Sequence, residues 1–306
     1  MARRELGRVL VTGAAGFVGA ALVEYLRLIN VSVNAADLRA DDAGNLVVCD
    51  LVDGDAVAAL VAGSAPDTII HCGAVSGPMV MADRPLDIWR INALGTAHVL
   101  EAAHRQGVGR TIVCSTSEVY GSRNDGMVDE ETRPEPNNVY GASKLAAEQA
   151  VIGYRREHGL DAAAIRLSWI YGPGRRTPTE LERILKNGMN ARRTTLGGRP
   201  DDVTHYLFRD DVVRCLVCAA TAPTLEWAVY NLTAGRGERL AGVVDAIRSE
   251  LPDLEVEFGG TEPATRGPIG FDQTRTAHSL GFRPETDFRT GVRRTLDALR
   301  LKLDAV

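Results

Sequence analysis

The stretch that decides the fold is Val9-Leu10-Val11-Thr12-Gly13-Ala14-Ala15-Gly16-Phe17-Val18-Gly19. A short β-branched run ends in a glycine-rich turn, and an amphipathic helical pattern follows directly. Gly13 suits a tight turn, Gly16 lets the backbone approach a pyrophosphate, and Gly19 permits close packing of helix on strand. The N–H groups and the positive dipole end of that helix would face the phosphates. The stretch therefore predicts a dinucleotide-binding turn, with an ordinary strand-to-helix turn as the alternative.

A carboxylate after the next apolar strand indicates which dinucleotide binds. Residues 31–36 read as that strand, and Asp37 follows 18 positions after Gly19. At about this spacing a carboxylate accepts hydrogen bonds from the ribose hydroxyls of NAD, and it repels the additional phosphate of NADP. We therefore expect NAD as the cofactor, although the neighbouring Arg39 leaves NADP open.

Composition limits the class of protein. The 306 residues are 45% hydrophobic and 25% charged, with a formal net charge of −5, which fits one large α/β domain or two closely joined ones. The sequence has neither the basic block of a nucleic-acid binder nor the roughly 18 to 20 apolar residues of a membrane span. Five cysteines, an odd number without secretory context, favour reduced thiols in the cytoplasm. Cys215 and Cys218 form a CxxC in an apolar helical run, so we expect packing there and no metal site.

Strand and helix patterns alternate through the first half of the chain. This alternation predicts a doubly wound parallel Rossmann sheet with helices on both faces. Residues 46–51 read as a strand that delivers Asp50, either as an acceptor for the adenine amino group or as a cap for the following helix. Residues 68–74 read as the next strand, and the small Gly73 and Ala74 leave room for a cofactor at its carboxyl end.

Three hydroxyl side chains follow the next predicted strand, at residues 110–114. Ser115, Thr116 and Ser117 stand at the carboxyl end of this strand. Adjacent hydroxyls in this position suit either turn formation or hydrogen bonds to a substrate oxygen.

A tyrosine and a lysine indicate the chemistry. Tyr140 and Lys144 are four residues apart, so they share one face of the helix predicted at 140–158. An ammonium beside a phenol stabilises the phenolate and moves its pKa toward neutrality, which makes the phenol usable as a general base. A surface pair on an amphipathic helix is the alternative.

With these residues the chain resembles the extended short-chain dehydrogenase/reductase family, in the NAD-dependent epimerase/dehydratase group that contains nucleotide-sugar epimerases. The resemblance covers nearly the whole chain. In chain order, the motifs that carry it are TGAAGFVG at 12–19, Asp37, Asp50-Leu51, Asn92, STSEVYG at 115–121, YGASK at 140–144, RLSWIYGPG at 166–174, FRDDVV at 208–213 and LGFRPETDFRTGV at 280–292.

The resemblance implies tyrosine-assisted hydride transfer between a carbinol and NAD. Tyr140 would take the hydroxyl proton, and Lys144 would bond the nicotinamide ribose and lower the pKa of Tyr140. Thr116 would bond the reacting oxygen, with Ser115 and Ser117 as its stand-ins. The expected cofactor-binding residues are Gly13, Ala15, Gly16, Phe17, Val18, Asp37, Asp50, Leu51, Gly73, Ala74, Asn92, Ser115, Tyr140 and Lys144. A homodimer is also expected, with the helices predicted at 84–106 and 140–158 pairing across a two-fold axis.

Three positions depart from the family's patterns. Ser117 replaces the acid of the Asp-Glu pair that performs water loss in sugar-nucleotide 4,6-dehydratases, so we expect no dehydratase. Trp169 stands where nucleotide-sugar enzymes usually carry Asn, and Thr204 where they usually carry the Arg that holds the diphosphate. Anion contacts could come instead from Arg175, Arg176, Arg192, Arg193 and Arg266, or these could hold the carboxylate of a small sugar acid. The expected substrate residues are Ser117, Glu118, Trp169, Arg175 and Arg266.

The pattern changes after residue 171. We assign 1–171 to the NAD-binding Rossmann domain and 172–306 mainly to a smaller C-terminal α/β substrate lobe. Segments near 205–235 and 283–306 are expected to return to the main domain. Helices are predicted at 177–190, 212–220, 240–251 and 290–303, and strands at 229–232 and 254–258.

Three functions remain open at this point. The first is an epimerase that oxidises a carbinol of a sugar or nucleotide sugar with tightly held NAD and returns the hydride to the opposite face. The second is a net NAD-dependent dehydrogenase of a small sugar, sugar acid or polyol, which Trp169 and Thr204 favour. The third is a non-catalytic NAD-sensing protein. The set of Thr116, Tyr140 and Lys144 argues against the third.

Overall fold

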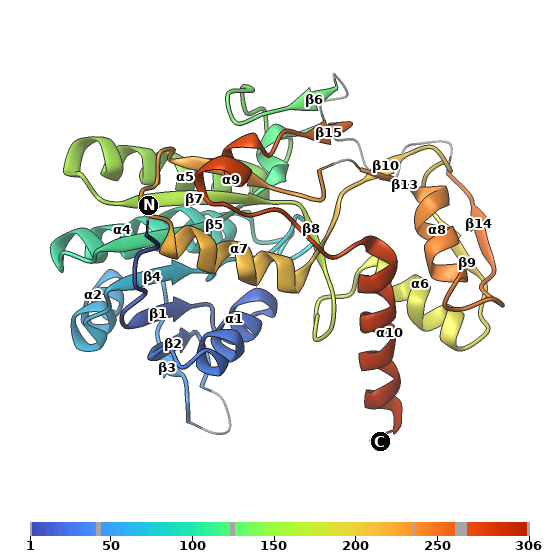
Figure 1. The fold of residues 1–306 in the computed structure, drawn as a ribbon, viewed down its shortest axis with the longest axis horizontal. Coiled ribbons are helices and arrows are strands. Elements are labelled where there is room, and N and C mark those ends of the chain that lie inside the picture. The colour runs from blue at the N-terminus through green and yellow to red at the C-terminus, as the bar shows by residue number, and fades with distance from the viewer. Residues whose placement is uncertain (1, 41–43, 123–125, 236, 261–267, 305–306) are drawn as a thin grey trace.

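A seven-stranded, fully parallel sheet forms the centre of the protein (Figure 1). The computed structural model describes residues 2–40, 44–122, 126–235, 237–260 and 268–304. In spatial order the strands are β12 (Val229–Leu232), β7 (Ala162–Leu167), β5 (Arg110–Thr116), β4 (Thr68–His71), β1 (Val9–Thr12), β2 (Val33–Asp37) and β3 (Val47–Val48). The predicted Rossmann sheet is confirmed. The strand order reverses between β1 and β4, so the ligand crevice lies at the carboxyl ends of these two strands.

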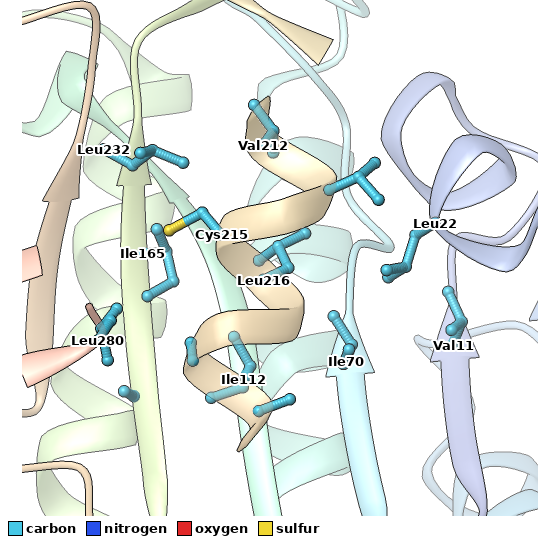
Figure 2. Close-up of a cluster of buried hydrophobic side chains, with 14 of the residues drawn as sticks. Val11, Leu22, Ile70, Ile112, Ile165, Val212, Cys215, Leu216, Leu232 and Leu280 are labelled. Carbon is cyan, nitrogen blue, oxygen red and sulfur yellow. The ribbon is translucent and has the colours of Figure 1, made fainter. Parts of the chain in front are cut away.

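Helices cover both faces of the sheet because its strands are apolar on both sides. One face carries α1 (Phe17–Leu28) and α7 (Arg209–Thr221), and the other carries α2 (Gly54–Ser64), α4 (Gly95–Arg105) and α5 (Val139–His158). Figure 2 shows Val212, Cys215 and Leu216 of α7 packed against the strands of the first face. Cys215 is completely buried there, which confirms that the CxxC lies in packed core.

The helix predicted at 84–106 consists of three joined parts. They are α3 (Pro85–Trp89), a π-helical turn (Arg90–Leu94) and α4. The wider turn contains Asn92, which is fully buried and hydrogen-bonded to the backbone of Val75 and to Ser143. π-Turns of this kind are frequent at functional sites.

The second lobe is a smaller α/β unit beside the carboxyl edge of the main sheet (Figure 1). Its helices are α6 (Glu180–Met189), α8 (Leu240–Arg248) and α10 (Phe288–Asp304). Its two-stranded sheets pair β8 (Trp169–Tyr171) with β11 (Tyr206–Phe208), β9 (Thr194–Leu196) with β14 (Val256–Phe258), and β10 (Val203–Thr204) with β13 (Glu238–Arg239). The helix predicted from 177 begins only at Glu180, because the Thr179 hydroxyl accepts a hydrogen bond from the Glu182 N–H and caps it.

The segment before α10 contacts the main domain. A short parallel pair joins β6 (Met127–Val128) to β15 (Gly270–Phe271), and α9 (Thr274–Ser279) then packs on β12. Leu280 and Phe282 enter the core of the main sheet. Within the range 283–306, the apolar face of α10 packs in the second lobe against α8 and β11. Within the range 205–235, α7 and β12 belong to the main sheet and its covering layer.

Candidate active site

The glycine turn after β1 crosses the end of β4 in very close contact. Gly13 has φ +70°, and a Cβ there would lie 2.5 Å from the backbone nitrogen of Gly73. A Cβ on Gly19 would collide with the carbonyl oxygen of Gly13. The N-cap residue of α1 is Gly16, which has no side chain to bond the first N–H groups of the helix, and such groups suit a pyrophosphate. The turn therefore has the shape that a dinucleotide requires.

Asp37 is fixed at the end of β2. Its carboxylate accepts hydrogen bonds from the N–H groups of Ala15 at 2.9 Å and Leu38 at 2.8 Å. Asp50 is exposed and accepts from the Val52 N–H at 2.9 Å. Leu51 packs on Gly73, where a Cβ would lie 2.5 Å from the Leu51 Cδ1. The position of the Asp37 carboxylate, bonded to the glycine turn, fits NAD.

Two arginines cover Phe17 at the start of α1. The guanidinium carbons of Arg175 and Arg209 lie 5.4 and 5.8 Å from the ring centroid. Arg175 Nη1 donates to the Ile170 carbonyl at 2.7 Å, whereas its buried Nε has no partner among the described residues. The loop after β8 thereby places positive charge beside the glycine turn.

Two of the expected cofactor residues support the site from behind. The Asn92 side chain accepts from the Val75 N–H at 2.8 Å and donates to the Ser143 hydroxyl at 3.0 Å, so it joins the loop after β4 to α5. The Ser115 hydroxyl donates to Glu148 at 2.5 Å. Both side chains are engaged inside the protein, and we assign them positioning roles.

A cavity of about 120 Å³ lies at the carboxyl edge of the sheet. Val18 and Ala74 are among its lining residues. The cavity brings together the expected catalytic residues Thr116, Tyr140 and Lys144 and the expected substrate residues Ser117, Glu118, Trp169 and Arg175. Arg266 lies outside the described residues.

The Tyr140 phenol has a pKa that differs from the expectation. Burial, with a smaller contribution from the nearby Glu118 carboxylate, raises the pKa of Tyr140 to about 12. A hydrogen bond with Thr116 and the Arg175 cation act in the opposite direction. Desolvation is the largest of these effects, so the pKa of Tyr140 lies above its ordinary value, whereas the sequence predicted a shift toward neutrality. Burial also lowers the pKa of Lys144.

Glu118 has hydrogen-bond partners that the sequence did not indicate. Asn138 Nδ2 donates to Glu118 Oε2 at 3.2 Å, and the Trp169 side chain also bonds this carboxyl group. Burial nevertheless raises the pKa of Glu118. Asn138 also caps α5, since its Oδ1 accepts from the Gly141 N–H at 2.8 Å. An asparagine directly before the predicted helix is a typical N-cap, and this sequence pattern could have identified Asn138 as a residue near the site.

A buried charged network lies beneath the cavity. Arg166 on β7 makes two hydrogen bonds to Glu148 on α5, at 2.9 and 2.7 Å. Its Nη1 donates to the Tyr120 hydroxyl at 2.7 Å, and this hydroxyl donates to Asn231 Oδ1 at 2.8 Å. The network fixes α5 to β5, β7 and β12.

A second cavity, of about 710 Å³, adjoins the first at Arg175, which lines both. It lies between the loop at 172–179, α6 and α10. Arg176, Lys186 and Arg192 contribute positive charge to its lining. Its volume is typical of a site for a small molecule.

Comparison with known proteins extends this description. Residues 9–233 match the NAD dependent epimerase/dehydratase family. A UDP-glucose 4-epimerase of Mycolicibacterium smegmatis is 31% identical over 314 residues, covering 96% of this chain and 99% of the relative. A dTDP-glucose 4,6-dehydratase of Streptomyces antibioticus is 29% identical, covering 95% and 92%. The solved structure of MoeE5 in complex with UDP-glucose and NAD superposes with a TM-score of 0.85 at 30% identity, covering 97% of this chain and all of that one.

The fold and the site define an NAD-dependent enzyme of the extended short-chain dehydrogenase/reductase type. The chain belongs to the NAD dependent epimerase/dehydratase family. Within the described ranges, no helix is long and apolar enough to cross a bilayer. In the same ranges, no cluster of three or more His, Cys, Asp or Glu side chains could hold a metal ion.

Proposed function

We propose that the protein epimerises a nucleotide sugar by transient oxidation of one of its carbinols. The observation that carries this proposal is the meeting of Thr116, Tyr140 and Lys144 in one cavity beside the glycine turn. Bound NAD would accept the hydride, return it to the opposite face, and bring a positive charge that favours the Tyr140 phenolate.

Each of the three side chains has a separate task. Tyr140 takes the carbinol proton and later returns it. The Thr116 Oγ1 accepts from the Glu118 N–H at 3.2 Å, which leaves its own proton for the Tyr140 oxygen or the substrate oxygen. Lys144, on the same face of α5, bonds the ribose hydroxyls of the cofactor and adds positive charge.

The nucleotide portion of the substrate belongs in the larger cavity. Its volume of about 710 Å³ and its basic lining suit an anionic group, and Arg175 adjoins both cavities. Thr204 stands at the position of the arginine that usually holds the diphosphate in this family, and it is buried in β10 and hydrogen-bonded to Tyr206. The basic residues of the larger cavity take over the role of that arginine. The named relatives, a UDP-glucose epimerase and a dTDP-glucose dehydratase, support a nucleotide-sugar substrate.

A net dehydrogenase of a sugar acid is the second candidate. Arg175 stands close enough to Tyr140 to lower the pKa of this phenol, and a guanidinium there suits a substrate carboxylate. In that reaction NADH would leave after every turnover.

The first experiment is to denature the purified protein and quantify the nicotinamide nucleotide released per chain. Near-stoichiometric NAD, with epimerisation of a UDP- or dTDP-hexose, supports the first candidate. An empty site, with NADH accumulating from a sugar acid, supports the second. Replacing Tyr140 by Phe should lower kcat by about 10²–10⁴-fold while NAD binding persists. Unchanged function in that variant would instead favour an NAD-sensing protein.

We further propose a cytoplasmic homodimer that acts in carbohydrate metabolism. Leu86, Trp89 and Leu94 are large apolar side chains exposed along α3 and the π-turn. α3 packs beside α5, so the two helices present a continuous face. The five cysteines, all free thiols, suit a reducing compartment.

A further inference from the structure

Two cysteines lie together on the floor of the catalytic cavity. Cys72 follows β4 directly and Cys114 lies in β5, and both line the cavity with Lys144. The parallel register pairs His71 with Val113, so the two cysteines are the next pair. Their Sγ atoms are 3.6 Å apart and hydrogen-bonded. Neither role proposed for the site uses these thiols.

The backbone geometry permits a bond between them. Neighbouring strands lie about 4.8 Å apart, within the Cα separation of about 4.4–6.8 Å found in disulfides. The sulfur atoms would have to approach from 3.6 Å to about 2.05 Å. A bond between directly paired strand positions is strained, and strained disulfides are readily reduced.

The surroundings make one thiol reactive. The hydrogen bond with Cys72 and the Lys144 ammonium lower the pKa of Cys114. The same hydrogen bond and burial raise the pKa of Cys72. Because the thiolate is the nucleophile, the member of the pair that ionises reacts with an oxidant, and the other remains a thiol that can resolve the product.

We propose that Cys72 and Cys114 form a peroxide-sensitive dithiol that closes to an intramolecular disulfide. The thiolate of one of the two cysteines attacks one oxygen of hydrogen peroxide, the O–O bond breaks, and a sulfenic acid and hydroxide result. The sulfur of the other cysteine attacks the sulfenic sulfur, the S–O bond breaks, and water leaves with the proton of that second thiol. In total the two thiols lose two electrons and two protons, and the peroxide becomes two molecules of water.

Cofactor binding controls access to this pair. The thiols open into the cavity where Lys144 would meet the nicotinamide ribose, so bound NAD covers them. This part of the inference rests on the proposed function, whereas closure of the disulfide in the cofactor-free protein does not.

The test is to treat cofactor-free protein with hydrogen peroxide and to follow free thiols and intact mass. We expect loss of two of the five thiols, a mass decrease of about 2 Da, a Cys72–Cys114 peptide on mapping, and reversal by dithiothreitol. Replacing Cys72 or Cys114 by Ser should abolish the disulfide, and replacing Cys218 by Ser should leave it intact. A disulfide that persists in either of the first two variants would refute the assignment, as would unchanged thiols in the wild type.

Two further measurements separate the possible failures. Phenylarsine oxide, which binds paired thiols, should bind the wild-type protein at one equivalent and neither serine variant, and no binding to the wild type would count against the pair. Saturating NAD should slow the oxidation about tenfold or more. An unchanged rate, with normal disulfide formation in the cofactor-free protein, would contradict the proposed cofactor position and leave the dithiol standing.

Discussion

Tyr140 lies between a carboxyl group and a guanidinium that act on its pKa in opposite directions. Glu118 raises this pKa and Arg175 lowers it, while burial dominates both. Proton abstraction requires the phenolate, so activity rises as pH rises through the pKa of Tyr140. The two neighbours therefore move the pKa of Tyr140 in opposite directions from the value that burial gives it.

We predict opposite pH shifts for variants of these two neighbours. Glu118→Gln removes negative charge, so the acidic limb of kcat/KM should move to lower pH. Arg175→Met removes positive charge, so the limb should move to higher pH. The measurement is the pH profile of kcat/KM for both variants and the wild type. Shifts in the same direction would contradict the assigned charges.

A second prediction at the residue scale concerns the contribution of the buried ion pair between Arg166 and Glu148 to the free energy of unfolding. Both side chains are almost completely buried. Arg166→Met leaves a buried carboxylate unpaired, which should cost about 3–5 kcal/mol in the free energy of unfolding, measured by urea denaturation. Arg183→Met breaks an exposed pair with Glu180 and should cost about 0–1 kcal/mol. Equal losses in the two variants would contradict the buried pair's role.

The sequence indicated the reacting residues but not their supports. Thr116, Tyr140 and Lys144 stand in recognisable motifs at the ends of predicted elements. Arg166 and Glu148, in contrast, lie within a strand and a helix, where a charged residue ordinarily indicates an exposed face. Their pairing depends on how α5 lies across β7, which no local pattern contains.

At the scale of elements, the crossing of two loops explains why glycine is required after β1. Gly13→Ala combines an unfavourable positive φ with a Cβ placed against the end of β4. We expect NAD affinity to fall at least about tenfold, together with a loss of stability of about 1–3 kcal/mol, measured by calorimetric titration and urea denaturation.

The matched control is another glycine. Gly63 on α2 has open space around its Cβ position, so Gly63→Ala should raise the free energy of unfolding by about 0.5–1 kcal/mol and leave NAD affinity unchanged. Equal changes in NAD affinity and in the free energy of unfolding at the two glycines would contradict the role assigned to close packing at the crossing.

Helices and strands were predicted well where the hydrophobic periodicity of the sequence is strong. They were predicted less well where tertiary contacts determine the helix type or the length of a strand. The helix at 84–106 was found as one segment, but its π-turn depends on the burial of Asn92 against the loop after β4. The strand predicted at 46–51 is reduced to two residues because it lies at the edge of the sheet and pairs with β2 only.

At the scale of the whole molecule, the exposed apolar residues of α3 make the proposed dimer testable. Trp89→Glu places a charge in that face and should convert the dimer to a monomer in sedimentation at micromolar concentration. Leu28→Glu, at an exposed position on α1, should leave the dimer intact. Sedimentation of the wild-type protein as a monomer would contradict the proposed dimer.

The sequence does not indicate which elements the helix α10 packs against. The apolar stripe of α10 shows only that the helix packs somewhere, and its partner α8 is determined by the course of the chain before it. The short helix α9 and the residues after it carry weaker periodicity, although they are the part that enters the main core.

The position of β12 has a consequence for how the protein is made. Six strands of the main sheet precede residue 168, but β12, which closes the edge beside β7, comes only after most elements of the second lobe. On the ribosome, the nascent chain therefore carries an open strand edge while much of the second lobe is synthesised. A chain that stopped at residue 171 would keep that edge bare, so biosynthesis depends on prompt completion of the later half.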